Sequence, residues 1–157
     1  MQNTILRWAW LGSSLFGIVL IGAGAFMALE GRAAHAEVRS ALAAERIVTP
    51  EDAALPGAPV TGPAEARAQS DVIWEHIMTS TKGKTYAELD RADPLRATYL
   101  NAVTLRTALM ESYLAFKVAD LVTGIGVIVA LLGASQVVLG GFLGLLTRRP
   151  SAEVPPQ

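Results

Sequence analysis

Hydrophobic and polar positions divide the chain into two apolar blocks around a polar middle. The first block, residues 8–29, has no charged residue over 22 positions, and the second, residues 121–147, has none over 27. As α-helices, both blocks are longer than the roughly 30 Å hydrocarbon core of a bilayer. The pattern therefore predicts two transmembrane helices.

The first block is not typical of a cleaved signal sequence. Arg7 precedes it, and Ala34, His35 and Ala36 provide small residues at a cleavage-like spacing. A signal core, however, is usually only about 7–15 residues long. We therefore expect an uncleaved membrane anchor.

The start of the polar middle continues the helical pattern of the first block. Ala34, Val38 and Leu42 recur at helical spacing, so we expect the first helix to leave the membrane and to end before Thr49 and Pro50. The following stretch, residues 49–63, contains four prolines, including the closing Pro63, and two glycines. It predicts an extended strap.

Three further signals predict helices in the rest of the polar middle. Gly62 and Pro63 open a helix over residues 64–79, which Lys82 and Gly83 close. Thr85 and Glu88 match a capping box and predict the start of a short helix. From Pro94 an amphipathic pattern runs without a breaker into the second block, which predicts one helix over about residues 95–146.

The predicted fold is an all-α membrane protein in which two transmembrane helices extend into a small helical extracytoplasmic head. Arg148 and Arg149 directly follow the second block, and the positive-inside rule places them and both tails in the cytoplasm. We expect a multi-pass protein of the bacterial plasma membrane. Its predicted parts are a tail (1–7), the first span (8–29), an extracytoplasmic helical segment (30–116), the second span with its interfacial start (117–147) and a tail (148–157).

Composition narrows the possible partners and chemistry. The formal net charge is -1, and basic residues alternate with acidic ones, so no basic surface for nucleic acid is predicted. The chain has no cysteine, which excludes disulfides and thiolate chemistry. The lipid bilayer is the one partner that the composition itself predicts.

Residues in the predicted loops and at the predicted helix ends form a sequence motif along the polar middle. Its members are Gly62, Pro63, His76, Gly83, Lys84, Thr85, Tyr86, Glu88, Asp93 and Pro94. Over roughly residues 46–120, this motif resembles that of the small two-span actinobacterial membrane proteins often labelled "aromatic ring-opening dioxygenase". The chain departs from that family at Lys82, where glycine is usual. The resemblance implies a two-span membrane protein and supplies no established catalytic residues.

A ring-opening dioxygenase requires non-haem iron, usually held by two histidines and a carboxylate. The chain has only His35 and His76, which are expected on different helices, and Glu75 precedes His76 without a second histidine following it. These three residues define the alternative hypothesis of a metal-dependent oxygenase. The favoured prediction is a protein with no catalytic site, no metal and no cofactor.

Two other groups of residues resemble ligand-binding motifs, but their spacing does not match those motifs. Gly83, Lys84 and Thr85 suggest a phosphate-binding loop, but Met78 occupies the position where that loop needs a glycine. The acidic residues Glu88, Asp90 and Asp93 lack a glycine-spaced loop of oxygen ligands. We interpret both groups as helix-end signals.

Small and polar residues inside the two blocks are the strongest packing signal. Small residues let membrane helices approach closely, and a polar side chain in a span is expected to face another helix. The candidates are Ser13, Gly17, Gly24, Gly126, Ala130, Ala134, Gln136, Gly140 and Gly144. They are expected to join the two spans, to contact another membrane protein or a second copy of the chain, or both.

These observations favour a non-enzymatic membrane protein that acts as an accessory, assembly or interaction subunit of a complex, or that self-associates. The metal-dependent oxygenase is the first alternative. The second alternative is an extracytoplasmic head that senses a ligand, for which the sequence offers Trp74 and a mixed polar surface.

Overall fold

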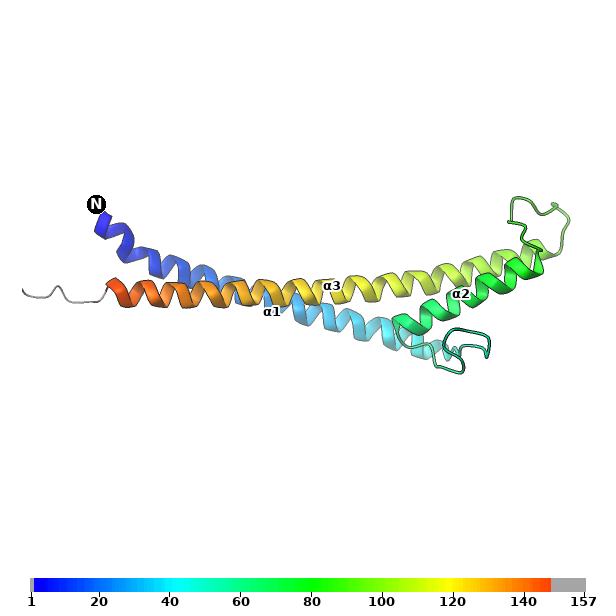
Figure 1. Cartoon of the computed structure of the whole chain (residues 1–157), viewed down its shortest axis with the longest axis horizontal. Helices are drawn as coiled ribbons and strands as arrows, with labels where there is room; N and C mark the ends of the chain where they lie inside the picture. The colour runs from blue at the N-terminus through cyan, green and yellow to red at the C-terminus, as the bar shows by residue number, and fades with distance from the viewer. Residues whose placement is uncertain (1, 148–157) are drawn as a thin grey trace, which may run out of the picture. The chain divides into compact units, whose positions relative to one another are not determined.

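The computed structural model describes residues 2–147, with side chains described for residues 8–146, and it consists of three α-helices (Figure 1). Helix α1 spans Gln2–Glu45, α2 spans Pro63–Ser80 and α3 spans Leu95–Thr147. The predicted all-helical class is confirmed, as are the uninterrupted first and last helices. The predicted tail with Arg148 and Arg149 lies outside the described residues.

The chain divides into two compact units, with boundaries after Glu30 and after Leu121. The first, here called the two-helix unit, comprises the described residues 2–30 and 122–147. The second, the three-helix unit, comprises residues 31–121. Helices α1 and α3 contribute to both units because no proline or other breaker interrupts either of them.

In the two-helix unit, α1 and α3 pack antiparallel through a glycine seam formed by Gly17, Gly24, Gly126, Gly133 and Gly140. A Cβ added at Gly24 would lie 2.5 Å from the carbonyl oxygen of Gly126, and one at Gly17 would lie 2.6 Å from that of Gly133. These neighbours are backbone atoms, which cannot rotate away. The seam therefore requires glycine for its backbone-to-backbone approach.

The outward surface of the two-helix unit is apolar. In the most hydrophobic window of each long helix, only 11% of the residues are buried. The exposed large side chains include Leu15, Phe16, Ile18, Phe26, Ile128, Leu131, Val138, Phe142 and Leu145. Helices α1 and α3 are thus long and apolar enough to cross a membrane, and they do not have the buried environment of core helices in a soluble protein.

The three-helix unit has a hydrophobic core of its own, built from all three helices and the segment between α1 and α2. Its first cluster joins Leu42 of α1, Val60 of the connecting segment, Ala66 of α2, and Leu109 and Phe116 of α3. The Phe116 side chain is fully buried. This cluster holds α2 against both long helices.

A second cluster joins the other end of α2 to the start of α3. Ile77, Leu89 and Tyr99 are buried in it. The rings of Trp74 and Tyr86 pack against Tyr99, with centroid distances of 6.3 and 6.0 Å. The segment between α2 and α3 is therefore fixed by aromatic packing although it has no regular structure.

The predicted extended strap is wrong, because residues 46–62 fold back on themselves. Val60 N donates to Ile47 O (2.9 Å), and Thr49 N donates to Ala58 O (3.0 Å). The buried Thr49 hydroxyl donates to the Leu55 carbonyl and accepts from Ala58 N. Gly57, with φ of 63°, allows the reversal.

The short helix predicted at Thr85 is also absent. Thr85 and Glu88 do interact, since the Glu88 carboxylate accepts from both the Thr85 amide and its hydroxyl at 2.8 Å. However, the Arg96 guanidinium of α3 donates to the carbonyls of Tyr86 (3.1 Å) and Leu89 (2.7 Å). The capping interaction therefore closes one turn, and Arg96 binds the carbonyls that follow.

Replacing Gly24 with alanine tests the glycine seam. Gly24→Ala is expected to lower the free energy of unfolding by about 1–3 kcal/mol, because the new methyl group meets backbone atoms of Gly126 and Ala130. Gly22→Ala is the matched control, since an added Cβ there meets nothing within 4 Å. The free energy of unfolding of both variants is measured in mixed micelles, with tryptophan fluorescence as the signal. Equal effects of the two substitutions would contradict the seam.

Candidate functional site

The structure places most of the packing candidates at the contact between α1 and α3. Gly17, Gly24, Gly126 and Gly140 lie in the seam, with Ala130 beside Gly24. A Cβ at Gly144 would lie 3.4 Å from the Trp10 ring.

One of the packing candidates, Ala134, lies outside the glycine seam, and one residue of the seam, Gly133, is not among the candidates. Ala134 is exposed, and its neighbour Gly133 is the residue that meets Gly17. Gly126, Gly133 and Gly140 are seven residues apart, whereas Gly126, Ala130 and Ala134 follow one another at intervals of four residues. A seven-residue repeat is the signal that identifies this face of α3.

The polar side chain in the second block faces α1. The Ser13 hydroxyl lies 3.0 Å from the Gln136 backbone carbonyl and 3.1 Å from Gln136 Oε1. Both residues are partly buried. Gln136 therefore finds its partner within the same chain, where a hydrogen bond in lipid would contribute roughly 1 kcal/mol.

The two histidines form separate pairs with different aspartates. His35 Nδ1 of α1 lies 3.0 Å from Asp120 Oδ1 of α3, and the His35 ring packs 4.8 Å from Phe116. His76 Nε2 of α2 lies 2.6 Å from Asp52 Oδ2 in the segment before α2. Among residues 2–147, no cluster of three histidine, cysteine or acidic side chains is arranged to hold a metal ion. The structure does not bring His35 and His76 together.

The contact between His76 and Asp52 changes the acid–base behaviour of the carboxyl group. The hydrogen bond from His76 is the main cause that lowers the pKa of Asp52 below 3.8. A lowered folded-state pKa stabilises the fold above the ordinary carboxyl pKa, and this contribution is lost as the pH falls through the lowered value. The pair therefore links the loop before α2 to α2 itself at neutral pH.

The other motif residues mark the ends of helices. Gly62 precedes α2, and Pro63 is its first residue. After α2, Lys82 and Gly83 have φ values of 53° and 79°, and the Thr81 hydroxyl donates to Lys84 O (2.7 Å). This geometry reverses the chain after the helix and does not lead into a new one, as a phosphate-binding loop would.

The acidic members of the motif bind backbone groups. Asp93 Oδ1 accepts from Leu95 N (2.8 Å) at the start of α3, with Pro94 between them. The Thr85 amide, followed by the Thr85 hydroxyl, lowers the pKa of Glu88. Each carboxylate thus compensates a free amide at a turn or helix start.

Basic side chains cover the aromatic residues of the three-helix unit. The Arg106 guanidinium lies 4.6 Å from the Trp74 ring centroid, and that of Arg96 lies 3.9 Å from the Tyr86 ring. Trp74 is also packed against Tyr99. The proposed sensing residue Trp74 is therefore covered by Arg106 and held in the core.

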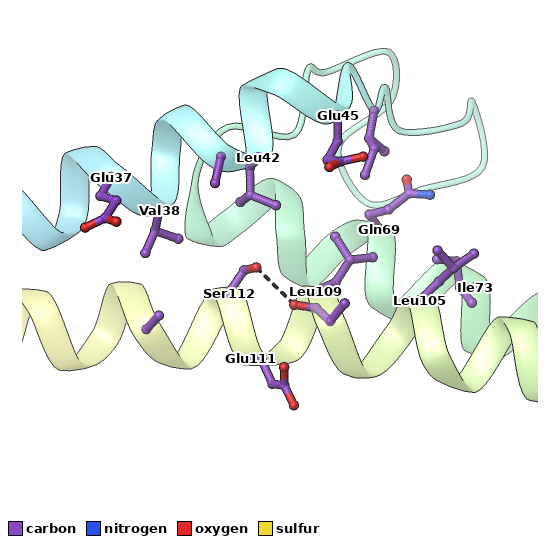
Figure 2. A pocket seen from close by; sticks show the side chains of 14 residues that line it. Glu37, Val38, Leu42, Glu45, Gln69, Ile73, Leu105, Leu109, Glu111 and Ser112 are labelled. Atoms are coloured by element: carbon purple, nitrogen blue, oxygen red, sulfur yellow. Dashed lines mark hydrogen bonds between the residues drawn. The ribbon is translucent and has the colours of Figure 1, made fainter.

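An apolar groove of about 740 Å³ opens in the three-helix unit between α1, α2 and α3 (Figure 2). Its lining includes the aliphatic side chains of Val38 and Leu42 of α1, Ile73 of α2, and Leu105 and Leu109 of α3. The groove was not predicted from the sequence, because residues of three separate helices line it, and several of these residues are small. Those small residues are Ala41, Ala108, Ser112 and Ala115.

Every charged side chain that lines this groove is acidic. Glu37 and Glu45 contribute from α1 and Glu111 from α3. The ion pairs found in the described part of the chain are His35–Asp120, Arg67–Asp71 and His76–Asp52, so none of the three glutamates is neutralised by one of them. The groove therefore combines an apolar surface with a negative rim.

His76→Ala tests the pair between the loop and α2. The pKa of Asp52 is expected to rise toward 3.8 because its main hydrogen-bond donor is lost. The pKa of Glu88 is expected to stay lowered, since its donors belong to Thr85. The pH dependence of side-chain carboxyl chemical shifts measures both groups in one titration. An Asp52 pKa that stays equally low in the variant would show that His76 is not the cause.

Comparison with known proteins adds no relative from which a role could be transferred. No family model matches the chain, and no curated protein or solved structure is similar to it.

Proposed function

We propose that this chain is a non-enzymatic integral membrane protein that acts as an interaction subunit of a membrane complex. The observation that carries the proposal is the outward apolar surface of two long helices whose own contact is already formed by glycine. In water such a surface would be a large aggregation liability, whereas in a bilayer it faces lipid. The closed seam leaves the three-helix unit as the part of the chain with surface for a partner.

On this proposal, α1 and α3 cross the bacterial plasma membrane, and the three-helix unit forms an extracytoplasmic head. The orientation rests on Arg148 and Arg149, which follow the second span. Membership of the two-span actinobacterial family belongs to the same proposal, on the motif residues at the ends of α2 and α3. The chemistry of the motif supports a structural role, because its side chains are used in turns, caps and one histidine–aspartate pair.

Purification tests the interaction role. Tagged protein extracted from its native membranes in a mild detergent is expected to appear in native mass spectrometry with a stoichiometric membrane protein, or as a defined multimer. Membranes without the tagged chain provide the background. A strictly monomeric species with no co-purifying protein would overturn the proposal.

Labelling of a single cysteine tests the orientation. The exposed Thr79 of α2 is a suitable position for it, because the chain has no cysteine of its own. Thr79→Cys is expected to react with a membrane-impermeant maleimide in intact cells. Gln2→Cys in the N-terminal tail serves as the reciprocal control and is expected to react only after lysis. The opposite pattern would reverse the topology.

A further inference from the structure

We propose that the groove of the three-helix unit binds an amphipathic, cationic α-helix of a partner protein. Apolar side chains of this helix would enter the groove, and basic side chains about two turns apart would face Glu37 and Glu45. The inference rests on the proposed function, since it specifies the kind of partner that the interaction subunit binds.

The apolar part of the argument comes from the lining of the groove. Val38, Leu42, Ile73 and Leu109 present aliphatic side chains, and Leu105 is 56% exposed although it lies among them. Figure 2 shows α1 and α3 as the two sides of the groove with α2 behind them. A fourth helix would complete the arrangement found in four-helix bundles and would cover Leu105.

The acidic side chains beside the groove determine which amphipathic helices it can bind. Glu37 and Glu45 are eight residues apart on α1, which corresponds to about 12 Å along the helix axis. Figure 2 shows Val38 and Leu42 between them on the same helix. A partner helix with lysine or arginine at positions i and i+7 or i+8 has the same spacing, and its leucines at i+3 and i+4 would then lie between the basic residues.

Glu37 and Glu45 take part in none of the ion pairs found among the described residues. Glu111 of α3 also lines the groove, but Figure 2 shows its carboxylate directed away from the space between α1 and α3. Two carboxylates beside one apolar surface repel an acidic helix and attract a basic one. The proposal therefore commits to a cationic partner helix.

The experiment uses the full chain in nanodiscs of zwitterionic phosphatidylcholine, with empty nanodiscs as background. The probe is a fluorescein-labelled 18-residue amphipathic peptide with leucines at helical spacing and lysines at i and i+7, and a second peptide has glutamates in place of the lysines. Fluorescence anisotropy is expected to show saturable binding of the lysine peptide only. Raising the ionic strength is expected to weaken that binding, because the glutamates lie at the exposed rim.

Two sets of variants locate the binding site. The double variant Glu37→Gln/Glu45→Gln is expected to weaken binding of the lysine peptide by about tenfold. Glu75→Gln removes an exposed carboxylate of α2 outside the groove and is expected to leave binding unchanged. Ala108→Trp fills the groove from the exposed surface of α3 and is expected to abolish binding, with circular dichroism confirming that the helices are retained.

Three results would overturn the inference. They are equal binding of the lysine and glutamate peptides, an equal loss of binding in Glu75→Gln, and saturable binding of octylamine without binding of any peptide. The last result would assign the groove to small amphiphilic amines, for which its volume is also suitable.

The same variants separate this inference from the proposed function. If Ala108→Trp still co-purifies with the partner of the wild-type chain, the interaction role stands and the groove is not its site. If the wild-type chain purifies alone and binds no lysine peptide, both proposals fail.

Discussion

The backbone contact between α1 and α3 is the interaction on which the two-helix unit depends. Lipid offers no hydrophobic drive for two apolar helices to associate, so their contact has to come from close packing and a few hydrogen bonds. Gly17, Gly24, Gly126, Gly133 and Gly140 provide the close packing, and Ser13 and Gln136 provide the hydrogen bond. Because these groups are satisfied by one another, the surrounding aliphatic and aromatic side chains are left exposed on the outward surface of the unit.

The three-helix unit is stabilised by a different balance of interactions. Burial of Leu42, Leu109 and Phe116 fixes the helices, while Thr49 and Arg96 organise the two irregular segments through backbone carbonyls. Cation–π contacts at Trp74 and Tyr86 cover the aromatic core without using an acidic partner. Among the described residues, Glu37, Glu45 and Glu111 take part in none of the ion pairs.

The sequence predicts the helices well because their signals are local. Pro63 and Pro94 mark helix starts, Lys82 and Gly83 mark a helix end, and uninterrupted apolar blocks predict the long helices. The predictions fail where distant residues decide the outcome. The Thr85 turn does not become a helix because Arg96, eleven residues later, binds its neighbouring carbonyls. A four-residue spacing of small residues leads to Ala134, whereas the seven-residue spacing of Gly126, Gly133 and Gly140 identifies the face that meets α1. The groove is lined by residues of three helices, and no local pattern encodes how these helices are arranged.

The central claim is that α1 and α3 of one chain form the glycine seam within the membrane. The most direct measurement is oxidative cross-linking in native membranes of the double variant Ser13→Cys/Gln136→Cys, because the chain has no other cysteine. The account predicts an intramolecular disulfide that is detected as a mobility shift of the monomer, while the outward-facing pair Gly12→Cys/Ser135→Cys remains unlinked within the chain. Cross-linking of the Ser13→Cys/Gln136→Cys variant only between chains, or equal cross-linking of both pairs within the chain, would contradict it.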